Sequence, residues 1–241
     1  MFKWLKKKPR TTGSGIGLPG GSEHYRAFVG PPHYYDLMAA MAFNLLTSIG
    51  LRQQHKFLDI GCGSLRMGRL LMPYLNKTNY IGVEPSEWLV QDGILNEIGK
   101  DMIRIKAPRF IFSDSLQEEQ ESLNINFALA QSIFTHCSKQ QISDWLSHLQ
   151  RHLADDGVLL ATYFIGEEDY TGEDWIYPDC SRYLTTTMSS LATENSLNFK
   201  VLDWRHPRNQ VWAAFYRNDF DVTMLPEEIT WNGYIDRLPP A

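Results

Sequence analysis

The stretch from residue 57 to residue 71 constrains the fold of this chain more than any other. It begins with the apolar run Phe57–Ile60, which contains one acid, Asp59, and which stops at Gly61 and Gly63 before a helical pattern. Glycine adopts positive φ and leaves main-chain N–H groups open to a ligand. The stretch therefore predicts a strand, a tight turn, and a helix whose N-terminus faces a bound molecule.

A second acid lies at the end of the next predicted strand. The apolar run Tyr80–Val83 is followed by Glu84, which comes 21 residues after Gly63. In parallel α/β folds, a carboxylate at about this spacing accepts hydrogen bonds from the two hydroxyls of a ribose. A dinucleotide fingerprint would have glycine three residues after Gly63, where this chain has Arg66. The spacing thus predicts a nucleoside site, with a dinucleotide-dependent oxidoreductase as a less favoured alternative.

The spacing of Asp59, Gly61, Gly63 and Glu84 resembles that of the class I S-adenosylmethionine-dependent methyltransferases. The resemblance covers roughly residues 35–217. It implies an α/β fold with a seven-stranded, mostly parallel Rossmann-like sheet, an antiparallel last strand and helices on both faces. It also implies S-adenosyl-L-methionine as the cofactor.

The rest of the chain has the alternating pattern that this fold requires. Further strands are predicted at residues 109–112, 127–130, 158–164, 199–204 and 210–216. Helices are predicted at residues 33–48, 86–98, 143–152 and 185–197. The short polar turn at 205–209 joins the last two strands, as in the antiparallel hairpin of the family. One departure is Leu65, where the family often has a small residue.

The resemblance also assigns the cofactor contacts. The glycine turn and the end of the second strand supply Asp59, Gly61, Cys62, Gly63, Glu84 and Pro85. FSDS, ending at Ser115, follows the third strand, and the family has an acid there that accepts a hydrogen bond from the adenine amino group. Asp114, with Ser115, is therefore assigned to the adenine, although Asp114 would also suit a helix N-cap. QSIFTH follows the central strand and contributes Gln131 and Ser132.

His136, the last residue of QSIFTH, is the predicted catalytic residue. A histidine has a pKa near the working pH and can act as general base on an acceptor hydroxyl or amine. The alternative is that His136 only holds the loop through a backbone hydrogen bond. Methyl transfer from a sulfonium depends mainly on alignment, so a base is needed only when the acceptor must lose its proton early.

Three segments are predicted to bind the acceptor. Residues 33–35 precede the first strand, residues 166–183 combine acids with aromatic residues directly after a strand, and His206 lies in the hairpin turn beside Arg208. The predicted acceptor-binding residues are Tyr34, Tyr35, Tyr170, Trp175, Tyr177 and His206. For each segment a structural alternative is open: packing for the first, a solvated acidic loop for the second and a solvated basic turn for the third.

Charge and composition narrow the choice of partner. The net charge is −5, and removing the five cationic residues within positions 1–10 leaves −10 for the rest. Such an acidic body is a poor ligand for nucleic acid. No apolar run approaches the roughly 20 residues of a membrane span, so no stable membrane insertion is expected. Three widely spaced cysteines give neither a disulfide framework nor a metal site, which fits a cytoplasmic protein.

Together these patterns predict a basic flexible tail at 1–22, a methyltransferase domain at 23–217 with a lid-like insertion at 166–183, and a C-terminal tail at 218–241 packed on the domain. The expected activity is methylation of a small molecule such as a natural product or a sugar, on oxygen in preference to nitrogen. A methyltransferase fold that serves only as a scaffold is the alternative. The sequence carries no signal for an oligomeric state. The whole interpretation requires Glu84 to face the glycine turn, with space for a ligand between them.

Overall fold

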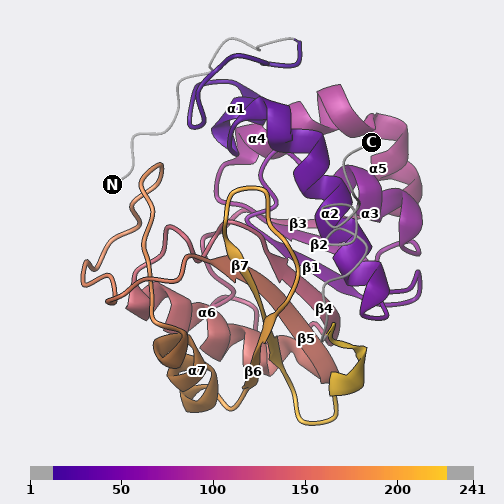
Figure 1. The fold of residues 1–241 in the computed structure, drawn as a ribbon. Coiled ribbons are helices and arrows are strands. Elements are labelled where there is room, and N and C mark those ends of the chain that lie inside the picture. The colour runs from indigo at the N-terminus through magenta and orange to yellow at the C-terminus, as the bar shows by residue number, and fades with distance from the viewer. Residues whose placement is uncertain (1–12, 227–241) are drawn as a thin grey trace, which may run out of the picture.

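One seven-stranded sheet forms the centre of the protein, in the order β3-β2-β1-β4-β5-β7-β6 (Figure 1). The computed structural model of the chain describes residues 13–226. The strands are β1 (Phe57–Ile60), β2 (Tyr80–Val83), β3 (Arg109–Ile111), β4 (Ile125–Ala130), β5 (Leu153–Tyr163), β6 (Asn198–Leu202) and β7 (Val211–Tyr216). Strands β1 to β5 pair in parallel, whereas β7 is antiparallel to both β5 and β6. The predicted fold class is confirmed.

Helices cover both faces of the sheet (Figure 1). They are α1 (Tyr25–Phe28), α2 (Tyr35–Ser48), α3 (Gly68–Tyr74), α4 (Glu87–Gly93), α5 (Lys100–Lys106), α6 (Lys139–His152) and α7 (Thr185–Glu194). Short 3-10 turns lie at η1 (Pro32–Tyr34) and η3 (Val222–Met224), and a π-helical turn at η2 (Ile94–Ile98). Helices α2 and α3 pack on one face, and α6 and α7 on the other.

The two cores follow from the alternation of side chains along the central strands. In β1, Phe57 joins the core beneath α2 and α3, whereas Leu58 joins the core beneath α6 and α7. Every residue of β1 is buried, as expected for a central parallel strand. Helix α6 begins at a capping box, in which the Ser138 hydroxyl accepts from the Gln141 N–H and the Gln141 side chain accepts from the Ser138 N–H.

Several element boundaries differ from the predicted ones. Helix α6 starts four residues earlier than the pattern indicated, because the capping box sets its start. Strand β5 begins at Leu153 and runs through exposed Asp155 and Asp156, where its register with β4 shifts. The predicted helix 86–98 is divided at Gly93, which packs directly against the backbone of Ser64. Helix α5 was not predicted.

The predicted terminal tails are described only in part. The cationic residues of positions 1–10 and residues 227–241 lie outside the described residues, so the tail boundaries stay predictions. Within the described part of the predicted C-terminal tail, Phe220 and Leu225 are buried in the core beside α2. Among the helices of residues 13–226, none has the length and apolar character to cross a bilayer.

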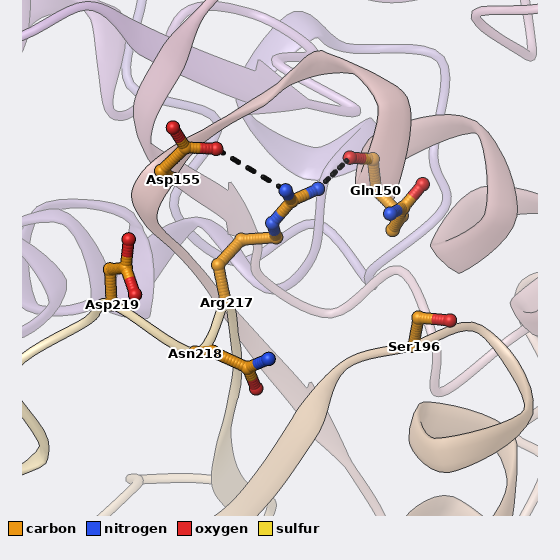
Figure 2. Close-up of a pocket in the computed structure, with 6 residues that line it drawn as sticks. All are labelled: Gln150, Asp155, Ser196, Arg217, Asn218 and Asp219. Carbon is orange, nitrogen blue, oxygen red and sulfur yellow. Dashed lines mark hydrogen bonds and ion pairs between the residues drawn. The ribbon is translucent and has the colours of Figure 1, made fainter.

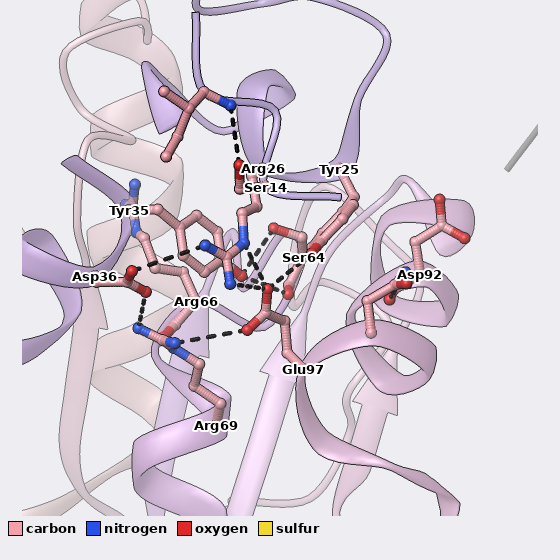
Figure 3. Close-up of polar contacts among 12 residues, drawn as sticks. Ser14, Tyr25, Arg26, Tyr35, Asp36, Ser64, Arg66, Arg69, Asp92 and Glu97 are labelled. Carbon is pink, nitrogen blue, oxygen red and sulfur yellow. Dashed lines mark hydrogen bonds and ion pairs between the residues drawn. The ribbon is translucent and has the colours of Figure 1, made fainter. Parts of the chain in front are cut away.

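An ionic network fixes α1 to the body of the protein (Figure 3). Oε1 of Glu97 accepts from the Tyr25 hydroxyl at 2.9 Å and from Nε of Arg26 at 2.6 Å. The other oxygen of Glu97 lies 3.5 Å from Nη1 of Arg69, and Nη2 of Arg69 lies 2.6 Å from Asp36. Because the Glu97 side chain is only 5% exposed, its charge is placed among these partners rather than in water.

Replacing Glu97 by glutamine is expected to lower the free energy of unfolding by about 1.5 to 3 kcal/mol, because hydrogen bonds to a charged group become neutral ones. Urea denaturation of both proteins measures the change. Glu87→Gln is the matched control, since Glu87 is exposed on α4. Equal free energies of unfolding for the two variants would show that the charge of Glu97 does not contribute to stability.

Candidate active site

The glycine bend, residues 61–63, joins β1 to the turn before α3 and lies against the end of β2. Gly61 and Gly63 have φ of 65° and 52°, a region that favours glycine. The Cys62 N–H donates to the Val83 carbonyl at 3.0 Å. Backbone pairing therefore places the bend directly beside the first residue after β2.

Glu84 is that residue, and its carboxylate faces the bend. Its Oε2 accepts from the Gly63 N–H at 3.1 Å, and its Oε1 accepts from the Ser86 N–H at 2.8 Å. Burial raises the pKa of Glu84, while the N–H groups of Ser86 and Gly63 oppose that shift. A carboxylate is therefore held at the edge of the bend, where the ribose ligand was predicted. Pro85, the next residue, is exposed.

Asp59 is buried in β1 and lines the small cavity beside the bend. Its carboxylate is buried and accepts from the Tyr80 hydroxyl at 2.7 Å. Burial raises the pKa of Asp59 to about 7, against the lowering effects of Tyr80 and Arg66, and the nearby charge of Glu84 adds to the rise. The hydrogen bond between Asp59 and Tyr80 links β1 to β2.

Two apolar side chains cover the glycine bend in this structure. Cγ1 of Val29 lies 2.6 Å from the position that a Cβ on Gly63 would occupy, and the Ile133 side chain lies against Gly61 in the same way. The cavity that is left, lined by Asp59, Gly61 and neighbouring residues, has a volume of about 10 Å³, which is room for one water molecule.

The residues at the bend fit an adenosyl sulfonium compound, with one spatial condition. Glycines bring main-chain groups to the surface of the bend, and Glu84 supplies a carboxylate of the kind that binds a ribose. Val29 lies against Gly63 and Ile133 against Gly61, and the cavity left beside the bend is only about 10 Å³. Binding of the cofactor therefore requires these two side chains to move off the bend.

The other predicted cofactor residues lie at the ends of β3 and β4. Asp114 is exposed three residues beyond β3, and the Ser115 N–H donates to the Ser113 hydroxyl. Gln131 is buried and lines the small cavity at the bend. Ser132 has a positive φ of 61°, and its N–H donates to the Thr162 hydroxyl at 2.7 Å. Their contacts with the cofactor stay predictions.

His136 is buried against the lid segment, residues 166–183. Its Nδ1 lies 2.6 Å from the carbonyl oxygen of Asp179. Since a carbonyl only accepts, Nδ1 carries the proton and the lone pair of a neutral ring is on Nε2. Burial lowers the pKa of His136, the Asp179 carbonyl opposes that shift, and the positive charge of Arg208 adds to it. The imidazole is thus neutral at physiological pH, as a general base requires.

The lid segment brings some of its predicted acceptor-binding residues to His136 and keeps others away. The ring centroid of Tyr177 lies 4.8 Å from that of His136, and the centroid of exposed Trp175 lies 5.4 Å away. Tyr170 instead packs on the core beneath α6 and α7. Asp169 accepts from the Leu184 N–H and the Thr187 hydroxyl, so this acid fixes the start of α7.

The lid segment also meets the segment that precedes β1. The Tyr177 hydroxyl donates to the Phe28 carbonyl, one residue before Val29. Tyr35 is fully buried, and its hydroxyl donates to the carbonyl of Ser64, the residue after the bend, at 2.9 Å. This hydrogen bond helps to fix the position of the bend. Tyr34 is half-buried and lies beside His33. Acceptor contacts of Tyr34 and Tyr35 stay predictions.

Sequence reasoning missed Arg66 as a site residue. Its Nη1 donates to the Val29 carbonyl at 3.1 Å, and its Nη2 donates to Oε1 of Gln131 at 3.4 Å. The signal was present, because Arg66 stands where a dinucleotide fingerprint has glycine. Val29 and Ile133 carried no such signal, since each is an ordinary apolar residue in the sequence.

A larger polar hollow of about 290 Å³ lies at the other end of the strands, near the start of β5 (Figure 2). Arg217 crosses it, donating to the Gln150 carbonyl at 2.9 Å and pairing with Asp155 at 3.3 Å. Because Asp155 is near the amino end of β5, this hollow is separate from the bend at the carboxyl ends of the parallel strands.

Comparison with known proteins identifies the family of this domain. Residues 32–219 match the family model described as a methyltransferase domain. The fold is similar to magnesium protoporphyrin IX methyltransferase from Synechocystis PCC 6803 with bound S-adenosylhomocysteine: TM-score 0.57, 13% identity, 78% of this chain and 84% of that one. A TehB-like S-adenosylmethionine-dependent methyltransferase from Corynebacterium glutamicum has TM-score 0.52 and 17% identity over 80% of this chain and 92% of that one.

The pyocyanin biosynthetic protein PhzM is similar as well, with TM-score 0.54 and 15% identity over 74% of this chain. The match spans about half of that longer protein, 55% of its length. At such low identities the solved structures show only that the fold is shared. The family is shown by the family model, because its match covers most of this chain. The chain belongs to the class I S-adenosylmethionine-dependent methyltransferases, and its cofactor is S-adenosylmethionine.

Proposed function

We propose that this methyltransferase methylates a small molecule, on oxygen in preference to nitrogen, between the lid segment and the glycine bend. The observation that carries the proposal is the buried, neutral His136 beside the lid aromatics Trp175 and Tyr177. When bound, S-adenosylmethionine supplies an electrophilic methyl group on a sulfonium.

Different residues bind the cofactor, bind the acceptor and accept its proton. Glu84 and the glycine bend hold the ribose end of the cofactor, with Asp114 and Ser115 toward the adenine. Trp175 and Tyr177 give apolar contact area for an acceptor and help to exclude water. The Nε2 atom of His136 takes the proton of an acceptor hydroxyl, whose oxygen is then free to attack.

We expect a narrow acceptor pocket, because the lid segment is hydrogen-bonded both to the segment before β1 and to the turn after β4. The Phe28 carbonyl is bonded to Tyr177, and the Ile176 N–H donates to the His136 carbonyl at 3.0 Å. A single small molecule suits such an enclosed site better than an extended nucleic acid, in agreement with the net charge of −5. A natural product or sugar-like acceptor is the proposed class.

A screen with isotopically labelled S-adenosylmethionine tests this function. The purified protein is incubated with phenols, hydroxylated natural products, sugars and matching amines, and products are detected by mass spectrometry. We expect labelled methyl ethers from at least one hydroxylated acceptor. Labelled amines alone would contradict the preference for oxygen. Tight binding of S-adenosylhomocysteine with no transfer to any acceptor would favour the scaffold alternative.

A further inference from the structure

Two arginines from distant parts of the chain approach the same backbone segment at residues 29–30. The guanidinium of Arg66 donates to the Val29 carbonyl at 3.1 Å. Nη1 of Arg208, in the turn between β6 and β7, lies 3.8 Å from the position that a Cβ on Gly30 would take. The two positive charges are close enough for Arg208 to lower the pKa of Arg66, after the larger effect of burial.

Arg208 has no partner for its charge in the part of the chain that the structure describes. Its side chain forms no hydrogen bond or ion pair within residues 13–226. Arg66, by contrast, donates hydrogen bonds to Val29 and Gln131, and the nearby negative charge of Asp59 acts to raise its pKa. Two like charges close together disfavour each other unless an anion lies between or beside them.

His206 adds an independent, buried donor to this group. The His206 ring is only 7% exposed, and its Nδ1 accepts from the Arg208 N–H at 3.2 Å. Burial, with the charges of Arg66 and Arg208, lowers the pKa of His206 to about 3. The neutral ring therefore carries its proton on Nε2, and this atom is buried with no hydrogen-bond partner in the described residues. An unmet buried donor is costly.

Arg208 and the Nε2–H of His206 are donors without an acceptor in the described residues, and Arg66 adds a second positive charge beside them. Donors and cations gathered in this way are the arrangement that binds an oxyanion. We propose that Arg208, Arg66 and the Nε2–H of His206 form a subsite that binds a carboxylate group of the acceptor. This inference rests on the proposed function and narrows it to acidic small molecules.

The position in the fold assigns the anion to the acceptor rather than to the cofactor. The predicted cofactor contacts lie at the ends of β1 to β4, and of the three subsite residues Arg66 lies beside them. Arg208 and His206 lie instead in the turn between β6 and β7, on the other half of the sheet. The charge of Arg208 also acts on His136 and Tyr177, the proposed base and its lid neighbour. A carboxylate held by Arg208 would therefore place the rest of the acceptor near His136.

Binding of matched acid and amide probes tests the subsite. The protein saturated with S-adenosylhomocysteine is titrated, at constant ionic strength, with benzoate and with benzamide, and with hexanoate and hexanamide, while thermal stability is followed. We expect at least one acid to stabilise the protein saturably and its amide to have no such effect. Arg208→Gln should weaken binding of that acid by about 10- to 100-fold, as for the loss of a charge-assisted hydrogen bond.

Arg205→Gln is the matched control, because it removes the same charge from another exposed position on the same hairpin that is not part of the proposed subsite. Its acid affinity should equal that of the wild type. Arg208→Glu is a second variant, and it should abolish acid binding. Equal responses to the acid and amide of both pairs, or equal acid affinity in Arg208→Gln and Arg205→Gln, would overturn the inference.

Titration of the same variants with S-adenosylhomocysteine alone separates the two sources of carboxylate. Unchanged affinity in Arg208→Gln supports an acceptor subsite. A tenfold loss would show that Arg208 binds the amino-acid end of the cofactor, which would overturn the inference. If acids bind as expected but no acceptor is ever methylated, only the proposed function fails. If S-adenosylhomocysteine binds and hydroxylated acceptors are methylated without any preference for acids, only the subsite fails.

Discussion

Replacing Glu84 by alanine is expected to lower the affinity of the protein for S-adenosylhomocysteine by about 100-fold or more. The carboxylate can accept from both hydroxyls of a ribose, and each such charged hydrogen bond contributes about 1.5 to 3 kcal/mol. Its place beside the glycine bend, 3.1 Å from the Gly63 N–H, suits this role. Isothermal titration calorimetry of the wild type and the variant measures the loss.

Glu84 also supports the bend itself, so the experiment needs controls for structure. Glu84→Gln keeps an oxygen for the N–H groups of Gly63 and Ser86 but removes the charge, and it should lose part of the affinity. Glu87→Ala removes an exposed carboxylate three residues further on and should bind as the wild type does. Thermal unfolding of each variant shows whether it is folded. Equal affinities of folded Glu84→Ala and Glu87→Ala would refute the ribose role.

The central part of this fold was predictable because local pattern and tertiary structure agree there. Phe57–Ile60 is a short, mostly apolar run stopped by glycines, a pattern that favours a buried strand, and all four residues are buried in β1. Glu84 follows the next such run, and parallel pairing of β1 with β2 brings it to the bend. The direction of the last strand followed from the short turn between β6 and β7.

The cover of the bend was not predictable, because it depends on which distant segments pack together. Val29, which lies against Gly63, follows α1, and Glu97 binds α1 through Arg26. Ile133, which lies against Gly61, belongs to the turn after β4. Neither pairing leaves a periodic or compositional trace in the sequence. Arg208 is exposed, as the alternative of a solvated basic turn predicts. Its approach to Gly30 was not predictable from the sequence, because the two residues are more than 140 positions apart.

Replacing His136 by asparagine is expected to lower kcat by about 10²- to 10⁴-fold while leaving the affinity for S-adenosylhomocysteine unchanged, because a general base contributes a factor of that size. Asparagine keeps an N–H donor for the Asp179 carbonyl, so it preserves the bond that fixes the ring in place. It has no basic nitrogen to replace Nε2. Single-turnover kinetics with the acceptor found in the screen measure the loss, and His148→Gln on α6 is the control.

The pH dependence provides a second, independent readout of the same residue. Burial lowers the pKa of His136 below its usual value of 6.5. Protonated His136 cannot accept a proton, so wild-type kcat/KM should fall as the pH falls through this lowered pKa, and the variant should lack that limb. Stability follows the same direction, because the unfolded state takes up the proton at a higher pH than the folded state does. Full activity of His136→Asn with an unchanged pH profile would leave His136 only its structural bond to the lid segment.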